Sequence, residues 1–245
     1  MKSFLFALQH LTRLPSPRVS FDEAVCGRAT VYFPVAGALL GAVMAALVWA
    51  AGPYLPHQLQ ASLLIFVMVM LTGGIHLDGF MDSIDGLFSG RPSEKKLEIM
   101  RDSRVGAFGV IGVICLLLLK FNLLAGIPNL VLIKLLIVVP ALSRWNMTFA
   151  VVVFPYARPE GLGTIYKEYS GTKELIWATV FAAAIAGLVL GVYGILIMVL
   201  GAAITYLLGI KITKELGGLT GDIYGFISEL SEVMLLLAAY PLLKI

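Results

Sequence analysis

The sequence predicts an all-α, polytopic integral membrane bundle of about seven spans, because the chain is too apolar to fold in water. Of its 245 residues, 59% are hydrophobic and 13% are charged, and the mean hydropathy is +0.93. A soluble domain carries about 25% charged residues. Apolar runs of about 17–25 residues, the length that crosses a bilayer as a helix, recur along the chain. The high apolar content also excludes a disordered chain. The net charge of +3, with no separate basic run, argues against nucleic acid as a partner.

Breaks in the apolar runs set the expected span boundaries. The fourth run is interrupted at residues 143–146, so its span is expected to end at Leu142. The run of residues 175–210 is too long for one span, and Gly191-Val192-Tyr193-Gly194 predicts a turn that divides it into two. The expected spans are Val31–Ala51, Leu59–Ile75, Phe108–Ile127, Asn129–Leu142, the two halves of Leu175–Ile210, and Ile223–Leu243.

The positions of the charges predict the orientation. With the N-terminus in the cytoplasm, nearly all Lys and Arg residues fall inside, and only Lys120, Lys134 and Lys244 fall outside. Every Asp and Glu then lies on the cytoplasmic side or at the cytoplasmic end of a span. Phe4, Leu8 and Leu11 predict a short amphipathic helix on the inner membrane surface. We therefore expect one domain, residues 1–245, with its active site facing the cytoplasm; the family resemblance described below implies the inner membrane of a prokaryote.

An acidic motif at residues 73–109 is the most informative segment. Asp78, Asp82 and Asp85 stand at i, i+4 and i+7, which places them on one face of a helix. Carboxylates stacked in this way repel one another unless a cation holds them. Oxygen ligands suit Mg²⁺, with Mn²⁺ as a substitute, and Mg²⁺ commonly bridges carboxylates and substrate phosphates. Asp102, at the mouth of the third span, is expected to complete the metal site; the alternative pairs it with Arg104 or Arg101.

Other residues of this segment have two interpretations each. Gly79 and Gly86 would let a substrate phosphate approach the backbone, or would serve helix packing. His76 would act as an acid, a base or a phosphate contact, or would be an interfacial histidine at a helix end. Residues 93–100 predict a short amphipathic helix that Ser93 caps.

A second group of polar residues lies near the C-terminus. Gly217–Gly221 precede Asp222, and this glycine-rich turn can offer N–H groups to an anion. Glu229 and Glu232 enter the last span, where acids are costly without partners. They would coordinate a cation, act as a general base, or form a structural ion pair with Arg144. Arg158, in a cytoplasmic loop, can bind phosphate.

The combination of motifs resembles the cobalamin synthase family, the adenosylcobinamide-GDP ribazoletransferases. The resemblance covers nearly the whole chain and rests on the motifs His76-Leu77-Asp78-Gly79-x-x-Asp82-x-x-Asp85-Gly86, Asp102-Ser103-x-x-Gly106-x-x-Gly109, Thr12–Pro15, Ser143-Arg144-Trp145, Arg158-x-x-Gly161-Leu162-Gly163 and Gly221-Asp222-x-x-Gly225-x-x-x-Glu229-x-x-Glu232.

The resemblance implies a late step of vitamin B12 biosynthesis. The cobinamide phosphate of adenosylcobinamide-GDP would pass to the 5′-hydroxyl of α-ribazole, or of its 5′-phosphate, with GMP leaving and Mg²⁺ as the cofactor. Asp78, Asp82, Asp85 and Asp102 would hold the metal, with Asp82, Asp85, Asp78 and His76 as the catalytic group. Gly79, Gly86, Arg104, Arg144, Arg158, Asp222, Glu229 and Glu232 would bind substrate.

Three other functions use similar acids. A CDP-alcohol phosphotransferase acting on lipid would carry an Ala-Arg pair, but Asp82 stands where the alanine is expected. A prenyltransferase normally has two Asp-rich motifs. A cation transporter would have its acids near mid-bilayer on broken helices. The bilayer is the expected surrounding, and assembly into a homo-oligomer is left open.

Overall fold

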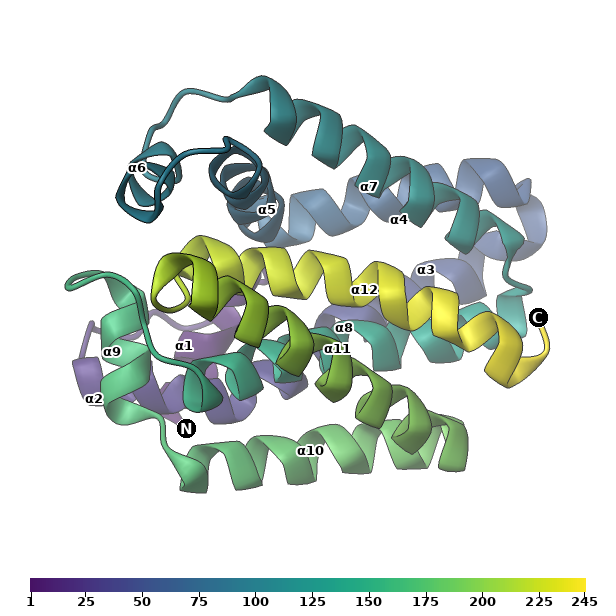
Figure 1. Ribbon diagram of the computed structural model, residues 1–245. Coiled ribbons are helices and arrows are strands. Elements are labelled where there is room, and N and C mark those ends of the chain that lie inside the picture. The colour runs from purple at the N-terminus through teal and green to yellow at the C-terminus, as the bar shows by residue number, and fades with distance from the viewer.

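The computed structural model describes residues 1–245, and nearly all of them are helical (Figure 1). The elements are α1 (Lys2–Leu11), α2 (Glu23–Gly27), the 3-10 helix η1 (Arg28–Tyr32), α3 (Phe33–Ala51), the 3-10 helix η2 (Gly52–Tyr54), α4 (His57–Thr72), α5 (Ile75–Leu87), α6 (Ser93–Ile99), α7 (Ala107–Gly126), α8 (Asn129–Val153), α9 (Leu162–Tyr169), α10 (Thr172–Leu190), α11 (Val192–Leu216) and α12 (Gly221–Leu243).

The all-helical membrane class is confirmed. Six helical segments are long and apolar enough to cross a bilayer, and α4 and α5 together form a seventh candidate that bends by 93°. The turn predicted at Gly191 is also correct, since α10 ends there and α11 begins at Val192. Gly191 has φ +60° and ψ −141°, a conformation open almost only to glycine.

The predicted end of the fourth span at Leu142 is wrong. Helix α8 continues without a break to Val153. The polar residues that suggested a break face the interior of the bundle, where Asn146 donates to the Ser231 hydroxyl and Arg144 pairs with Glu232. A helix satisfies its own backbone hydrogen bonds, so buried polar side chains with partners need not end it.

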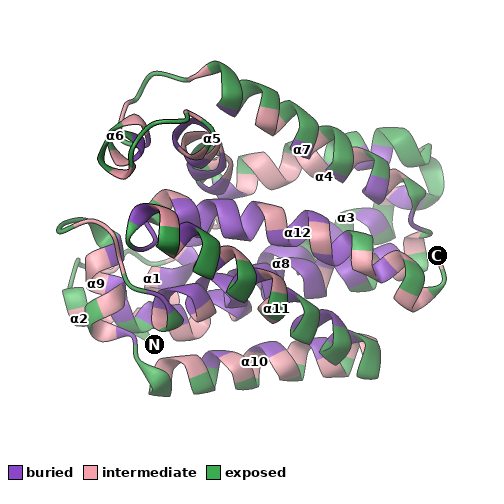
Figure 2. Cartoon of the chain, in the orientation of Figure 1, coloured by how far each residue is buried: buried purple, intermediate pink, exposed green.

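Helices α8 and α12 form the centre of the bundle (Figures 1 and 2). In the most apolar window of α8, 78% of residues are buried, against 17% in α10 at the periphery. Helix α3 lies against α8 through Gly37 and Gly41, where any side chain would meet the carbonyls of Pro140 and Leu136. Small residues of this kind let membrane helices approach closely.

The short helices α1, α2, α5, α6 and α9 gather at one end of the bundle, while short turns connect the spans at the other (Figure 1). Helix α1 forms as predicted, but Leu8 and Leu11 are buried against the protein, so its apolar face does not lie on lipid. Helix α6 also forms, although Pro92 is its N-cap residue and Ser93 makes no capping hydrogen bond, contrary to the prediction.

Candidate active site

Two consecutive glycines set the direction in which the acidic helix α5 leaves α4. Gly73 (φ +66°) and Gly74 (φ +72°) both adopt the left-handed conformation and turn the chain between α4 and α5. Side chains other than glycine adopt this conformation rarely and at a cost. The Arg13 guanidinium covers Gly73, and the Arg13 N–H donates to the Leu71 carbonyl. The N-terminal segment therefore secures the bend that carries the acids across the end of the bundle.

Glycines also bring α5 against the start of α12. A Cβ on Gly79 would lie 2.9 Å from the Asp222 carbonyl oxygen, and one on Gly225 would lie 3.1 Å from the His76 carbonyl oxygen. Each of these glycines thus serves close helix packing. Gly86 faces α6 instead, where a Cβ would meet the Met100 side chain at 2.6 Å. The glycine-containing motif of α5 and that of α12 therefore pack against each other where the two helices cross.

This crossing assembles an acidic cluster from both motifs. Asp78 and Asp82 come from α5 and Asp222 from α12, and the charge of Asp82 interacts with those of the other two. Arg158 approaches from the loop before α9, and its Nη2 lies 2.7 Å from Asp222 Oδ2. Asp82 and Asp222 are half-buried and Asp78 is exposed. Three carboxylates and one guanidinium therefore lie together in a region that is partly shielded from solvent.

Asp85 performs a different task, although it lies on the same helix. Its Oδ2 accepts from the Gly106 N–H and its Oδ1 from the Gly109 N–H, both at 2.8 Å. These amides belong to the first turn of α7, where backbone donors have no partner within the helix. The Asp85 carboxylate thus caps α7 and is buried while doing so.

Replacing Asp85 by asparagine should therefore affect stability more than chemistry. The amide keeps one acceptor but presents an NH₂ to the second backbone donor and removes the charge that favours a helix N-terminus. We expect the free energy of unfolding to fall by about 1–2 kcal/mol, with kcat within about tenfold of wild type. Denaturation in detergent measures the first and turnover the second. Asp22→Asn, at the exposed cap of α2, should change neither; a kcat loss at Asp85 without a stability loss would contradict the capping role.

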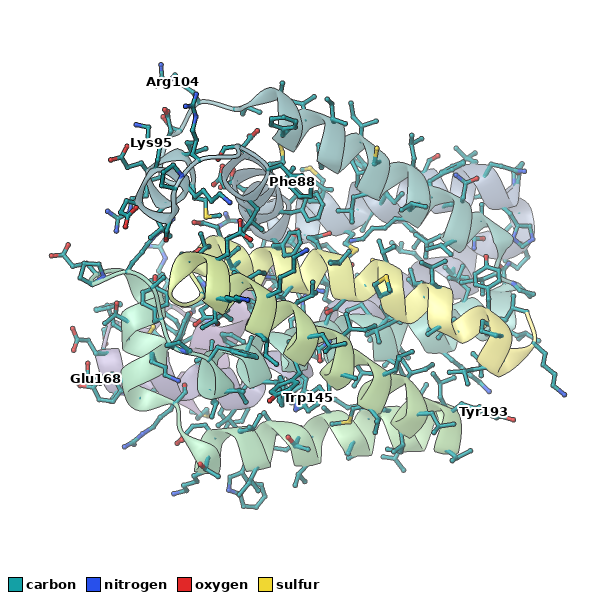
Figure 3. The ribbon with its side chains drawn as sticks, viewed as in Figure 1. Phe88, Lys95, Arg104, Trp145, Glu168 and Tyr193 are labelled. Carbon is teal, nitrogen blue, oxygen red and sulfur yellow. The ribbon has the colours of Figure 1, made fainter.

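The structure does not bring Asp102 to the acidic cluster. Its carboxylate binds its neighbour Arg104, whose Nη2 lies 2.6 Å from Asp102 Oδ2, and this hydrogen bonding lowers the Asp102 pKa to about 2. Arg104 itself projects away from the bundle (Figure 3) and is exposed. The alternative pairing of Asp102 with Arg104 is thus the observed one.

Glu229 and Glu232 lie within the bundle, in a buried ion network. Lys120 Nζ lies 2.5 Å from Glu229 Oε2 and 2.7 Å from Glu232 Oε2, and Glu232 also pairs with Arg144. An Arg144 Nη2 reaches His76 Nδ1 at 3.3 Å. The structural ion pair with Arg144 is therefore present. Lys120, expected within the third span and assigned to the outer side, lies within α7 and is almost fully buried. The two glutamates, expected at the end of a span, lie in the middle of α12.

A cavity of about 200 Å³ opens beside the acidic cluster. Asp78 and Asp222 are the two acids of its lining, and the remainder of the lining is aromatic, apolar or glycine. Burial lowers the pKa of His10 to about 4 and holds the pKa of Tyr166 well above its ordinary value, so both side chains are uncharged near neutral pH. The lining residues include His10, His76, Met147, Leu162, Tyr166 and Tyr224. The site thus joins a charged mouth to a neutral chamber.

Sequence reasoning missed Lys120 and the neutral side of the cavity. A lone lysine in an otherwise apolar run could have been paired with the two glutamates of the last span, since buried membrane charges require partners. His10, Tyr166 and Tyr224 carry no such signal, because their helices meet only in the folded chain.

Comparisons with known proteins agree on one family. Residues 3–240 match the family model described as cobalamin-5-phosphate synthase. An adenosylcobinamide-GDP ribazoletransferase of Roseiflexus sp. (strain RS-1) is 40% identical over 231 residues, covering 94% of this chain and 86% of that protein. Another from Desulfitobacterium hafniense (strain Y51) is 40% identical over 251 residues, covering 99% and 98%. No solved structure matches the chain.

Proposed function

The chain belongs to the cobalamin-5-phosphate synthase family, and from this membership together with the site we infer that it catalyses the reaction of adenosylcobinamide-GDP ribazoletransferases. The 5′-hydroxyl oxygen of α-ribazole attacks the phosphorus that carries the cobinamide. The bond from that phosphorus to the bridging oxygen of the diphosphate breaks, GMP leaves with that oxygen, and a phosphodiester forms. The hydroxyl proton passes to a base of the enzyme. α-Ribazole 5′-phosphate is an alternative acceptor.

The observation that carries the proposal is the acidic cluster at the mouth of the cavity. Phosphoryl transfer requires charge neutralisation on the phosphate oxygens and in-line positioning of nucleophile and leaving group. Carboxylates at a diphosphate site act through a divalent cation, and Arg158 at the same mouth can bind phosphate directly. The cavity of about 200 Å³ beside them gives a substrate group a place next to these acids.

Asp82 and Asp222 are the residues that we propose to hold Mg²⁺. No three His, Cys, Asp or Glu side chains form a ready coordination set, but Mg²⁺ is commonly held by one or two carboxylates together with substrate phosphates. The donor set therefore fits: two half-buried oxygen ligands from different helices whose negative charges add. When bound, Mg²⁺ would neutralise charge on the diphosphate oxygens.

The remaining groups of the mouth have separate tasks in this proposal. Arg158 exchanges part of its pairing with Asp222 for a contact to the diphosphate. Asp78 borders the cavity and is the most exposed of the three acids, so it receives the proton of the acceptor hydroxyl. Asp85 and Asp102, expected as metal ligands from the sequence, have other partners and support the site from outside it.

The charges favour a mouth that faces the cytoplasm. Arg13, Arg28 and Arg91 lie in or beside the surface segments at this end of the bundle, and basic residues are enriched on the cytoplasmic side of membrane proteins. A nucleotide-linked donor would then reach the acids directly from the cytoplasm.

Release of GMP by the purified protein tests the proposal. Protein in detergent is given adenosylcobinamide-GDP and α-ribazole, with Mg²⁺ or with a chelator. We expect GMP only when both substrates and the metal are present, and restoration when Mg²⁺ is added back after chelation. Release without α-ribazole would indicate hydrolysis of the donor. No release from a folded sample would contradict the proposed reaction, and release that survives chelation would contradict the metal assignment.

A further inference from the structure

The cavity beside the acidic cluster contains buried polar atoms that no protein group satisfies. His76 and Tyr224 are each 3% exposed and both line the cavity. The Nε2 atom of His76 and the hydroxyl of Tyr224 have no hydrogen-bond partner. Leaving such a group unpaired in a buried position costs about 1–3 kcal/mol. The Tyr166 hydroxyl, on another lining residue, also has no partner, and three such atoms at one cavity indicate that a ligand supplies the missing partners.

The hydrogen bond from Arg144 determines what His76 can offer. A guanidinium is always a donor, so the contact from Arg144 Nη2 to His76 Nδ1 makes Nδ1 an acceptor. The single proton of the neutral ring is then on Nε2, the atom without a partner. Arg144 is itself held by Glu232 in the buried network. The network is therefore a positioning device that fixes His76 as a hydrogen-bond donor at the cavity.

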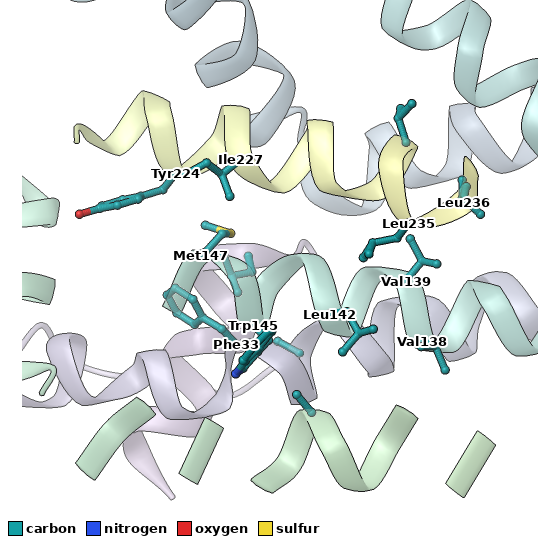
Figure 4. Close-up of a cluster of buried hydrophobic side chains, with 14 of the residues drawn as sticks. Phe33, Val138, Val139, Leu142, Trp145, Met147, Tyr224, Ile227, Leu235 and Leu236 are labelled. Carbon is teal, nitrogen blue, oxygen red and sulfur yellow. The ribbon is translucent and has the colours of Figure 1, made fainter. Parts of the chain in front are cut away.

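Tyr224 adds a second directed group. Its side chain leaves α12 with the hydroxyl pointing away from the apolar cluster of Leu142, Trp145 and Ile227 (Figure 4). Its ring stacks against that of Tyr156, with centroids 6.4 Å apart and an interplanar angle of 23°. Met147 and Leu162 supply apolar lining. The cavity therefore combines flat aromatic and apolar surface with a few neutral hydrogen-bonding groups.

We propose that this cavity is the acceptor subsite, where α-ribazole binds with its base in the chamber, its ribose on His76 and Tyr224, and its 5′-hydroxyl at the acidic mouth. The inference rests on the proposed function and assigns one of its two substrates. Away from its two acids the lining has no charged group, so it fits an uncharged nucleoside and not a diphosphate. The corrin macrocycle is larger than the cavity.

Steady-state kinetics with both substrates varied tests the subsite. Tyr224→Phe should raise the KM for α-ribazole about fivefold, the value of one neutral hydrogen bond, and change the KM for adenosylcobinamide-GDP less than twofold. His76→Asn removes the donor at the Nε2 position and should raise the acceptor KM about tenfold. His76→Gln, whose longer amide returns a donor there, should recover most of the loss. Tyr54→Phe, at an exposed tyrosine in η2 between α3 and α4, is the control and should change neither value.

Two further measurements separate the inference from the proposed function. Equilibrium dialysis of α-ribazole alone should detect binding to wild type and about fivefold weaker binding to Tyr224→Phe, whether or not the protein releases GMP. With three histidines in the chain, ¹⁵N-histidine spectra should show His76 protonated at Nε2 and not at Nδ1. Release of GMP with an unchanged acceptor KM in both Tyr224→Phe and His76→Asn would overturn the subsite alone. A rise in the donor KM instead would assign the cavity to the donor and overturn it as well.

Discussion

Replacing Asp82 by asparagine should lower kcat about a thousandfold and leave the protein as stable as wild type, or more so. Asparagine has nearly the same shape but no charge, so the site loses half of its proposed carboxylate ligands for Mg²⁺. A metal acting on phosphate oxygens contributes several kcal/mol to the transition state, and about 4 kcal/mol corresponds to a thousandfold in rate. Single-turnover GMP release at saturating substrates measures the effect on the chemical step.

Stability distinguishes a role in the site from a role in folding. Burial and the like charges of Asp78 and Asp222 destabilise the charged Asp82 carboxylate, so removing its charge relieves both costs in the metal-free protein. The thermal midpoint without Mg²⁺ should therefore stay the same or rise. Added Mg²⁺ should stabilise the Asp82→Asn protein less than wild type, because a ligand that binds only the native state stabilises the fold in proportion to how tightly it binds.

Glu94→Gln provides the matched control for Asp82→Asn. Glu94 is an exposed acid in the first turn of α6, and its loss should change neither turnover nor the response to Mg²⁺. Wild-type turnover in a folded Asp82→Asn protein would contradict the assignment of Asp82. A large loss of stability in the Asp82→Asn protein would show that Asp82, like Asp85, supports the fold.

The parts of the fold that depend on composition and local spacing could be predicted from the sequence. Hydropathy gives the spans because a bilayer requires about 20 apolar residues in each helix. The i, i+4 spacing puts Asp78 and Asp82 on one face of α5, and glycine marks the turn at Gly191. Each of these signals lies within a few residues of the feature that it predicts.

Features that depend on distant partners could not be predicted in the same way. Asp85 looks like the third member of an acidic face, but its partners are the backbone N–H groups of Gly106 and Gly109, 21 and 24 residues later. Helix α8 continues past Leu142 because Arg144 finds Glu232 across 88 residues. One-dimensional patterns show that a charge needs a partner, but the helix packing decides which partner it receives.

Replacing Lys120 by methionine should destabilise the protein by about 3–5 kcal/mol, the cost of leaving a buried acid without its cation. Methionine retains the length and apolar stem of lysine, so the packing of α7 against α12 is largely kept. What is lost is the ammonium group that contacts both Glu229 and Glu232, at 2.5 and 2.7 Å, where all three side chains are at most 6% exposed. Arg144 alone would then face two glutamates. Denaturation in detergent or nanodiscs should show a midpoint lower by roughly 10 °C.

The double variant Lys120→Met with Glu229→Gln tests whether charge balance causes this loss. It removes one charge of each sign and leaves Arg144 paired with Glu232, so most of the lost stability should return. The exposed pair Lys95 and Glu98, whose Nζ and Oε2 are 2.5 Å apart, is the matched surface control; Lys95→Met should cost less than about 1 kcal/mol because solvent screens it. Equal losses in Lys120→Met and the double variant would instead attribute the effect to packing. Because Arg144 also holds His76, Lys120→Met should raise the acceptor KM as well, and the double variant should restore it, which links the buried network to the site.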